Sequence, residues 1–279
     1  MAAEERAFPG RFANRVAFIT GAGRGQGASH ALRLAELGAD VAIIDLGDAG
    51  AVTAPRYATA QRRDMDEVAA SIRQLGRRAI VIEADVRSAD QMASAGERAV
   101  VELGRIDFVI ANAGITDAFA PTWEISPQNW QTMIDINLTG VFHTIRATVP
   151  HMLSAPTGRG VVLIGSGVAI KAVPNLSHYV AAKSALRGLA AALAAELGPY
   201  GIRCNSIHPA GIDTEMTTAM VELNGIERSQ LLEGFRSNQL LDRNVAVSDV
   251  TAALVWLLSE EARSVTGLEL TVDAGETKK

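Results

Sequence analysis

Short apolar segments alternate with amphipathic stretches through most of the chain. Most of these segments are apolar almost without interruption, which is typical of parallel strands covered on both faces. The predicted strands are Val16–Thr20, Val41–Asp45, Ala79–Glu83, Phe108–Ala111, Val161–Ile164, Cys204–Ile207 and Leu268–Val272.

The stretches between these segments have the apolar spacing of amphipathic helices. Repeated alternation of strand and helix implies right-handed crossovers. No linker, repeat or low-complexity segment divides residues 1–279, so we predict a single α/β domain. Its doubly wound parallel sheet would have about seven strands and carry helices on both faces. The predicted helices are Gly27–Leu37, Asp64–Leu75, Ser88–Leu103, Trp130–Met152, Tyr179–Leu197 and Ser248–Ser259.

Two segments interrupt the alternation. Residues 46–63 are polar and irregular, and long loops of this kind in compact domains are usually functional or mobile. Residues 213–243 carry Met216 and Met220 at helical spacing just past the carboxyl end of a strand, where a substrate lid would lie. The alternative for both segments is a solvated surface excursion.

The composition is that of an ordinary globular protein, with 48% hydrophobic and 20% charged residues. A formal net charge of −5 argues against a broad basic face for nucleic acid. Cys204 is the single cysteine, which excludes an intramolecular disulfide and fits a reducing compartment. Residues 1–6 lack the apolar stretch of a secretory signal, and the apolar runs are too short to span a bilayer. We expect a cytoplasmic protein without nucleic-acid or membrane partners.

A glycine cluster directly follows the first predicted strand. Glycines there allow a sharp turn and let the backbone approach a pyrophosphate, whose charge meets the N-terminus of the next helix. A tight turn alone would also explain the cluster, but its place between strand and helix favours a dinucleotide site. The residues expected at the cofactor are Gly21, Gly23, Arg24, Gly25, Gln26 and Gly27.

The second strand ends at Asp45, where a carboxylate can accept hydrogen bonds from an adenosine ribose. An ionised carboxylate repels a 2′-phosphate, so Asp45 favours NAD over NADP. Arg24 is the opposing signal, since a guanidinium can bind a phosphate. The residue after Asp45 is Leu46 and not arginine, so we predict NAD. The alternative is that Asp45 is an exposed strand-end residue.

Two further strand ends are candidate cofactor contacts. Asp85 and Val86 follow the third strand, where a carboxylate can accept from an adenine amino group, although Asp85 could equally cap a helix. Asn112, Ala113 and Gly114 follow the fourth strand, and their small size would let the backbone pass close to a ribose; an ordinary turn is the alternative.

Tyr179 and Lys183 are four residues apart in a predicted helix and so lie on one face. The ordinary pKa of a phenol is near 10, and a neighbouring ammonium lowers it by stabilising the phenolate. Ser166 could hold a substrate oxygen beside that phenol. His178 precedes the tyrosine but points elsewhere on a helix, so we expect a pocket-wall or surface residue. No cluster of His, Cys and carboxylates has metal-ligand spacing.

Together these residues resemble the classical short-chain dehydrogenase/reductase family. The motifs are Thr20-Gly21-x-x-x-Gly25-x-Gly27, Asn112-Ala113-Gly114, Asn137, Ser166 and Tyr179-x-x-x-Lys183, in a stretch from about residue 13 to 275. The resemblance implies a Rossmann-like domain, with residues 13–115 mainly binding the dinucleotide and residues 116–275 carrying catalysis and substrate.

The same resemblance implies a catalytic tetrad of Asn137, Ser166, Tyr179 and Lys183, in which Asn137 holds a water linking Lys183 to solvent. A buried helical asparagine bonded to backbone is the alternative for Asn137. The resemblance also places Ile212 and Thr214 at the nicotinamide carboxamide, gives Tyr179 and Lys183 cofactor contacts, and implies a homotetramer. Alanines at 181, 185, 192 and 195 would permit close helix packing in such an oligomer, or burial within the monomer.

A narrower similarity, to the carveol-dehydrogenase-like, mycofactocin-associated subgroup, rests on Arg24-Gly25-Gln26-Gly27-x-Ser29-His30-Ala31 and on the insert at 46–63. It implies NAD held tightly under the insert, a redox partner that recycles it, and a secondary alcohol substrate of terpenoid type.

The predicted activity is hydride transfer between NAD and a hydrophobic secondary alcohol or ketone. The alternatives are a dinucleotide-sensing regulator without catalysis, a 3-oxoacyl or other carbonyl reductase of the same family, and a sugar-nucleotide epimerase, which would need a larger C-terminal domain. The apolar residues expected on the pocket wall are Ile115, Phe119, Val168, Ile170, Val173, Met216 and Met220.

Overall fold

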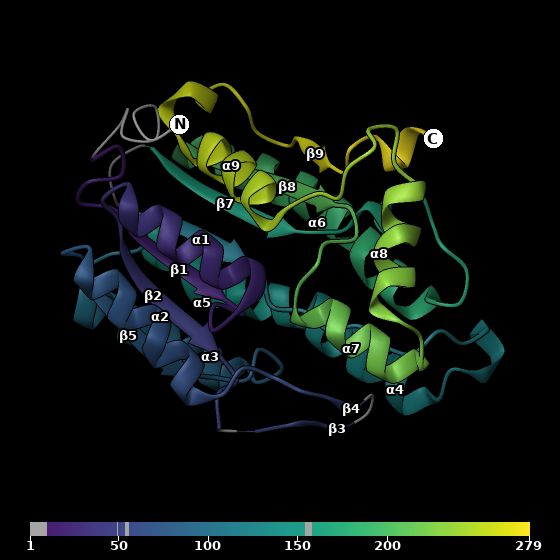
Figure 1. Cartoon of the computed structure of the whole chain (residues 1–279). Coiled ribbons are helices and arrows are strands. Elements are labelled where there is room, and N and C mark those ends of the chain that lie inside the picture. Colours follow the sequence, from purple (N-terminus) through teal and green to yellow (C-terminus); the bar gives the residue numbers. More distant parts are fainter. Residues whose placement is uncertain (1–9, 49, 54–55, 154–157) are drawn as a thin grey trace.

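The computed structural model describes residues 10–48, 50–53, 56–153 and 158–279, without the side chain of Arg56. Seven strands form one parallel sheet in the order β5-β2-β1-β6-β7-β8-β9, which confirms the predicted doubly wound fold (Figure 1). The strands are β1 Val16–Thr20, β2 Asp40–Asp45, β5 Ala79–Glu83, β6 Phe108–Ala111, β7 Arg159–Ile164, β8 Ile202–Pro209 and β9 Glu269–Val272.

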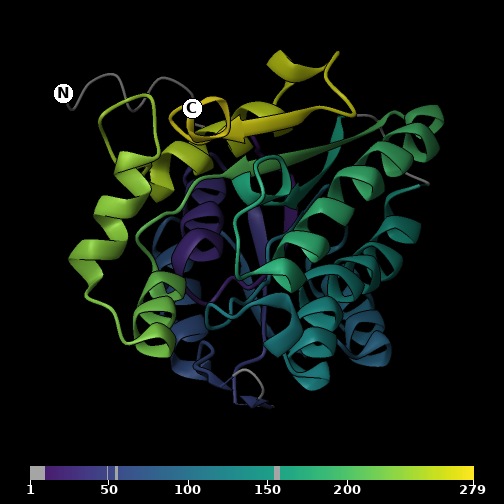
Figure 2. The same ribbon diagram turned by 90° about the vertical axis from the view of Figure 1, so that its right-hand side faces the viewer.

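Helices cover both faces of this sheet (Figures 1 and 2). One face carries α1 Gly25–Glu36, α2 Arg62–Gln74 and α9 Val247–Leu258, and the other carries α3 Ala89–Leu103, α5 Gly140–Met152 and α6 Ser177–Leu197. The 3-10 turns are η1 Thr122–Glu124, η3 Gly167–Ala169, η4 Gly198–Tyr200, η5 Glu260–Ala262 and η6 Glu276–Lys278. Within the described ranges, none of the helices has the length and apolar character needed to cross a membrane.

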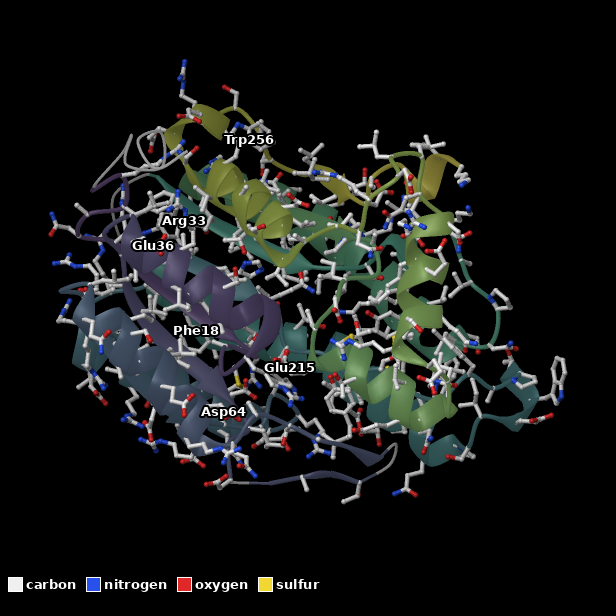
Figure 3. All side chains as sticks on the ribbon, viewed as in Figure 1. Phe18, Arg33, Glu36, Asp64, Glu215 and Trp256 are labelled. Carbon is white, nitrogen blue, oxygen red and sulfur yellow. The ribbon has the colours of Figure 1, made fainter. Side chains whose placement is uncertain are left out.

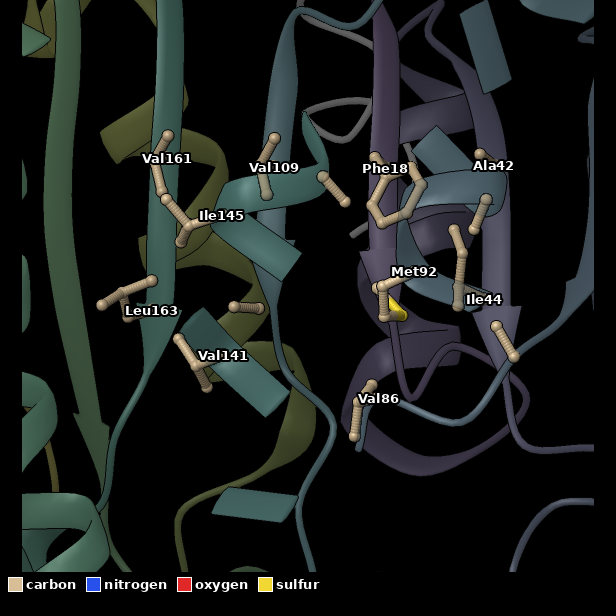
Figure 4. Packing of buried hydrophobic residues seen from close by; sticks show 14 of the residues in the cluster. Phe18, Ala42, Ile44, Val86, Met92, Val109, Val141, Ile145, Val161 and Leu163 are labelled. Carbon is tan, nitrogen blue, oxygen red and sulfur yellow. The ribbon is translucent and has the colours of Figure 1, made fainter. Parts of the chain in front are cut away.

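Each central strand contributes to two hydrophobic cores. Phe18 packs beside Met92 on the α3 and α5 side, in the same core as Ile145 (Figure 4). Its neighbour Ile19 packs on the side of α1 and α9. Because successive side chains of a strand point to opposite faces, burial of both faces requires apolar residues at every position. All five residues of β1 are buried.

The predicted helix Trp130–Met152 is interrupted. Its residues belong to α4 Pro127–Ile134, a π-helical turn at Asp135–Thr139 (η2) and α5. Ser126 caps α4, since its hydroxyl oxygen accepts a hydrogen bond from the Asn129 N–H at 3.0 Å. Such π-helical turns are frequent at functional sites, and this one contains Asn137.

The two interrupting segments are partly regular. The 46–63 segment contains an antiparallel pair of two-residue strands, β3 Val52–Thr53 and β4 Arg56–Tyr57, and ends in the first turn of α2; residues 49, 54 and 55 lie outside the described part. The 213–243 segment forms α7 Glu215–Asn224 and α8 Arg228–Ser237. Figure 1 shows α7 and α8 at the end of the sheet where β7 and β8 finish.

Candidate active site

The candidate site lies at the carboxyl ends of β1 and β6, where the strand order reverses. The Asn112 side chain joins the two strands, because its Nδ2 donates hydrogen bonds to the carbonyl oxygens of Thr20 (2.9 Å) and Gly21 (3.1 Å). A Cβ on Gly21 would lie 2.8 Å from the Cα of Ala113, and the φ of Gly21 is +66°. Glycine is therefore required there for the two loops to meet.

The four glycines of the loop have different roles. Gly21 and Gly25 lie on the wall of the cleft beside the loop. A Cβ on Gly27 would lie 2.1 Å from the Gly21 carbonyl oxygen, so Gly27 allows α1 to begin against the loop. Gly23 donates its N–H to Asp45 Oδ2 at 2.9 Å. Gly23 and Gly27 shape the loop and, within the described structure, do not line the cleft.

Asp45 lies at the end of β2 with its carboxylate facing the glycine loop. Its Oδ1 accepts a hydrogen bond from the Leu46 N–H at 2.8 Å, and its Oδ2 accepts the one from Gly23. Burial raises the pKa of this carboxyl, and the two backbone hydrogen bonds oppose that rise. Each oxygen accepts one backbone hydrogen bond and keeps a lone pair that can serve a ligand hydroxyl. Asp45 is therefore part of the cleft wall and not an exposed strand end.

Arg24 is held by the insert. Its guanidinium lies 5.9 Å from the ring centroid of Tyr57 and donates a hydrogen bond to the Ala58 carbonyl oxygen. These contacts fix Arg24 above the cleft and join the glycine loop to the 46–63 segment.

Asp85 and Val86 both line the cleft. The Asp85 carboxylate forms a fork with Arg87, whose Nε donates to Oδ1 at 2.9 Å and whose Nη2 donates to Oδ2 at 2.5 Å. The helix cap is Ser88 and not Asp85, because the Ser88 hydroxyl accepts from the Gln91 N–H at 3.3 Å.

Most of the predicted cofactor residues share this cleft, which also includes unforeseen neighbours. Glu215, in the first turn of α7, places its Oε2 3.0 Å from the position of a Cβ on Gly25 (Figure 3). No spacing in the sequence links Glu215 to the loop. The predicted residues on the wall are Gly21, Arg24, Gly25, Gln26, Asp45, Leu46, Asp85, Val86, Asn112, Ala113, Gly114, Tyr179 and Thr214, and the added ones include Val52, Tyr57, Thr59, Ala60 and Glu215.

The cleft fits a dinucleotide. Gly21 and Gly25 lie on its wall without a side chain, which leaves the backbone of the loop accessible to a pyrophosphate. The buried Oε1 of Gln26 has no hydrogen-bond partner among the described residues and so can accept one from a ligand. No group of three or more His, Cys, Asp or Glu in the described part of the chain could hold a metal ion.

Tyr179 lies on the wall of two cavities, the cleft just described and a second cavity of about 510 Å³. Burial raises the pKa of its phenol to about 12, and a hydrogen bond with Ser166 opposes that rise. Lys183 lies one turn further along α6, with its Nζ 5.8 Å from the Tyr179 ring centroid. Burial lowers the pKa of the Lys183 ammonium to about 8.

The Lys183 ammonium is tied to the sheet and not to an acid. Its Nζ donates a hydrogen bond to the Ile164 carbonyl oxygen at 3.0 Å. A Cβ on Gly114 would lie 3.3 Å from this Nζ and 2.7 Å from Asn137 Oδ1. Gly114 therefore fits between the lysine and the asparagine, and the fold brings together three residues that are far apart in sequence.

Asn137 uses its side chain to hold backbone. Its Oδ1 accepts from the Ile115 N–H at 3.2 Å, and its Nδ2 donates to the carbonyl oxygens of Ile115 (3.3 Å) and Met133 (3.2 Å). This is the backbone-bonded arrangement that the sequence left open as the alternative. The side chain positions the loop after β6, next to Lys183.

Ser166 follows β7 and begins the turn η3. Its hydroxyl oxygen accepts from the Val168 N–H at 3.4 Å, and its carbonyl oxygen lies 3.2 Å from His208 Nδ1. The buried His208 ring occupies the space beside Gly165, where a Cβ would lie 2.5 Å from Nδ1. His208 thus packs against the loop that carries Ser166. Its position in the sequence, within a predicted strand region, did not indicate this role.

The prediction that His178 is a pocket-wall or surface residue is wrong. Its ring is fully buried, is absent from the walls of both cavities within the described structure, and places Nε2 2.9 Å from Asp117 Oδ2. Burial favours the protonated form of Asp117, but hydrogen bonds from His178, Ala118 and Asn129 outweigh it and lower the Asp117 pKa. The helix turns His178 away from Tyr179 and into this buried pair.

The second cavity is mainly apolar and meets the cleft at Gln26, Tyr179, Thr214 and Met216. Of the residues predicted for the pocket wall, Ile115 lines the cleft instead. In the described part of the chain, Ile170 lies on the wall of neither the cleft nor the second cavity. Helix α8 and the end of α7 close the far side, which the sequence did not specify residue by residue. The predicted residues found here are Phe119, Val168, Val173, Met216 and Met220, together with Ile212, and the added apolar ones are Leu176, Ile226, Leu231 and Phe235.

Comparison with known proteins agrees with this geometry. A family model described as enoyl-(acyl carrier protein) reductase matches residues 21–277. The chain is 42% identical to (−)-trans-carveol dehydrogenase of Rhodococcus erythropolis over 96% of this chain and 99% of that protein. It is 34% identical to cyclohexanol dehydrogenase of an Acinetobacter species, over 99% and 100%. The crystal structure of carveol dehydrogenase from Mycobacterium avium in complex with NAD superposes with a TM-score of 0.91 at 40% identity, covering 97% of this chain and 100% of that one.

The resemblance seen in the motifs is therefore confirmed over nearly the whole length of the chain. This chain belongs to the short-chain dehydrogenase/reductase family.

Proposed function

We propose that this chain is an NAD-dependent oxidoreductase that interconverts a hydrophobic secondary alcohol and its ketone. The observation that carries the proposal is the position of Tyr179 on the wall of both the dinucleotide-shaped cleft and the apolar cavity. A proton donor and acceptor at that junction can reach a substrate oxygen in one cavity beside a cofactor in the other.

The residues of the cleft would hold NAD in a defined order. The loop residues Gly21 and Gly25 would face the pyrophosphate, Asp45 the adenosine ribose, and Asp85 and Val86 the adenine. Asn112, Ala113 and Gly114 would face the second ribose, and Ile212 and Thr214 the carboxamide. NAD, when bound, supplies the hydride acceptor or donor.

The chain's own residues move the proton. In the oxidising direction the Tyr179 phenolate takes the proton of the substrate hydroxyl, and Ser166 donates a hydrogen bond to the substrate oxygen. Because burial raises the pKa of Tyr179 to about 12, the phenolate needs a nearby cation. The Lys183 ammonium, 5.8 Å from the ring, supplies that charge. Asn137, whose side chain bonds the backbone at Ile115 and Met133, positions the loop beside Lys183.

The substrate class follows from the second cavity. Its apolar wall from α7, α8 and the 166–176 loop suits a cyclic, terpenoid-like alcohol such as carveol, in agreement with the names of the similar carveol and cyclohexanol dehydrogenases. The similarity to the carveol-dehydrogenase-like subgroup leads us to propose that NAD stays bound through turnover and is recycled in place by a redox partner.

We further propose a cytoplasmic homotetramer assembled in part through α6. The alanines at 181, 185, 192 and 195 are exposed in the monomer, so burial within the monomer is excluded and a subunit contact is favoured.

A panel of secondary alcohols assayed with an artificial electron acceptor tests the activity. We expect turnover of carveol and cyclohexanol, and none of a primary alcohol too short to fill the cavity. NAD binding without turnover of any alcohol or ketone would favour the regulator; preference for 3-oxoacyl thioesters would favour the carbonyl reductase.

A further inference from the structure

A single acidic side chain enters the apolar cavity from the end of the chain. Glu276 begins the short turn η6 and lies on the cavity wall. The preceding turn is fixed by Asp273, whose carboxylate accepts from the N–H groups of Gly275 (3.0 Å) and Thr277 (2.9 Å). The Glu276 side chain therefore leaves a well-ordered backbone.

The Glu276 carboxylate is held close to the catalytic serine loop. It accepts a hydrogen bond from the Gly211 N–H, and its Oε2 lies 3.9 Å from the position of a Cβ on Gly167, the residue after Ser166. Gly167 and Gly211 lie on the same cavity wall. The carboxylate thus faces the space that the rest of a substrate molecule would occupy while its oxygen is hydrogen-bonded to Ser166.

The cavity holds no charge that would compensate this carboxylate. Among the described residues of its wall, Glu276 is the charged one, and none is lysine, arginine or histidine. Lys171 is the nearby cation, but its exposed Nζ donates to the backbone carbonyl oxygens of Glu276 (3.3 Å) and Lys279 (3.1 Å). Burial and Asp273 both raise the pKa of Glu276, and Lys171 and the Gly211 N–H oppose that rise.

We propose that Glu276 is a specificity-determining residue that admits uncharged alcohols and rejects substrates bearing a carboxylate or another anionic group. A second negative charge in this apolar space would face Glu276 with no cation to pair with, and like charges brought together at low dielectric strongly disfavour binding. Rejection of the wrong substrate by repulsion is a common source of specificity. This inference deepens the proposed alcohol dehydrogenase activity and rests on it.

The competing explanation is a purely structural one, in which Glu276 only ties the chain end to Gly211. The substitution Glu276→Gln separates the two, because glutamine keeps an oxygen that can accept from the Gly211 N–H and loses the charge. Glu233→Gln is the matched control, since Glu233 lies exposed on α8, paired with Arg236 and away from the cavity wall.

The test compares 4-hydroxycyclohexanecarboxylate with its neutral isostere 4-hydroxycyclohexanecarboxamide. We expect the wild type and Glu233→Gln to prefer the carboxamide, and Glu276→Gln to raise the ratio of kcat/KM for carboxylate over carboxamide by at least about tenfold. An unchanged ratio in Glu276→Gln, or a wild type that uses both compounds equally, overturns the inference.

A binding measurement separates this inference from the proposed activity. Calorimetry on the NAD-loaded wild type with cyclohexanecarboxamide and cyclohexanecarboxylate needs neither turnover nor a folded variant. We expect the carboxamide to bind at least about tenfold tighter. If no alcohol is oxidised but this preference is found, the proposed activity fails and the inference stands; equal or tighter binding of the carboxylate overturns the inference alone.

Discussion

The guanidinium of Arg24 lies 5.9 Å from the ring centroid of Tyr57 and donates a hydrogen bond to the neighbouring Ala58 carbonyl oxygen. This contact joins the glycine loop to the insert across the top of the cleft. Because Arg24 and Tyr57 both line the cleft, we expect a bound dinucleotide to lie beneath this contact and its release to require the contact to open.

We therefore expect freshly purified protein to retain NAD through dialysis. Tyr57→Ala removes the ring under Arg24 and should speed the loss of NAD most. Tyr57→Phe keeps the ring and loses only the hydrogen bond between the phenol and Arg24, so its effect should be smaller. Absorbance and mass spectrometry of the denatured supernatant measure the bound NAD. Wild-type protein that emerges free of cofactor would contradict this role of the insert.

The second prediction concerns the acid–base group. Tyr179→Phe removes the phenol oxygen proposed to take the substrate proton at the junction of the two cavities, so kcat should fall by about a hundredfold to ten-thousandfold. NAD affinity should change little. Tyr200→Phe, an exposed tyrosine on η4, is the matched control and should leave kcat unchanged. Turnover that survives in Tyr179→Phe would falsify the mechanism.

We expect the choice of cofactor to depend on Asp45. The carboxylate at the end of β2 should make the wild type bind NAD at least about tenfold tighter than NADP, because it repels a 2′-phosphate. Asp45→Asn should narrow that preference, while Asp90→Asn, on the exposed first turn of α3, should not. Titration of each variant with NAD and with NADP measures the ratio of the two affinities. Tighter NADP binding by the wild type would assign control to Arg24 instead.

The buried ammonium of Lys183 makes stability depend on pH. Its pKa falls from 10.5 to about 8 in the folded protein, a change that costs about 3 kcal/mol at pH 7. Lys183→Met removes that cost. It also leaves the Ile164 carbonyl oxygen without its donor, which destabilises the folded protein by roughly 1–3 kcal/mol. At pH 7 the cofactor-free variant should match or exceed the stability of the wild type, although we expect it to be inactive.

The sign of the pH dependence follows from proton binding. Between about pH 8 and 10.5 the unfolded chain keeps the Lys183 proton that the folded protein has released. This group therefore makes the wild type more stable as the pH rises. The advantage of Lys183→Met should therefore shrink across that window. Urea unfolding at pH 7 and pH 9.5 measures the difference, and an advantage that grows with pH would disprove burial of the ammonium.

The last prediction tests the glycine loop. Gly27→Ala places a Cβ 2.1 Å from the Gly21 carbonyl oxygen, so α1 must move away from the loop. We expect loss of both stability and NAD binding. Gly188→Ala is the control: a Cβ at Gly188 in α6 meets nothing within 4 Å, and alanine in a helix should stabilise by about 0.5–1 kcal/mol. Thermal unfolding and NAD titration of the two variants distinguish them.

Most of the sheet could be predicted because its physical requirement is local. A parallel strand covered on both faces needs apolar residues at nearly every position. Val16–Thr20, Ala79–Glu83 and Phe108–Ala111 match their observed bounds for that reason, with the polar Thr20 and Glu83 at strand ends. The glycine loop and the Tyr179–Lys183 pair were visible for a similar reason, since each depends on neighbours within one or two turns of chain.

The turn at Asp135–Thr139 shows where local pattern stops. No proline or glycine within those five residues marks the interruption of the predicted helix. It coincides instead with Asn137, whose side chain bonds the backbone at Ile115, twenty-two positions earlier. The prediction for His178 was wrong for the same reason, because its partner Asp117 is 61 positions away.

The sequence by itself determined the parallel sheet, the glycine loop after β1 and the Tyr179–Lys183 pair, because each follows from spacing within a short segment. Only the tertiary structure decided which distant residues complete the candidate site: Tyr57 under Arg24, His208 beside Ser166, Glu215 beside Gly25, and Glu276 in the cavity. Their contacts join segments that are separated by tens to hundreds of residues and depend on how the crossovers bring the strand ends together, which no periodicity along the chain records.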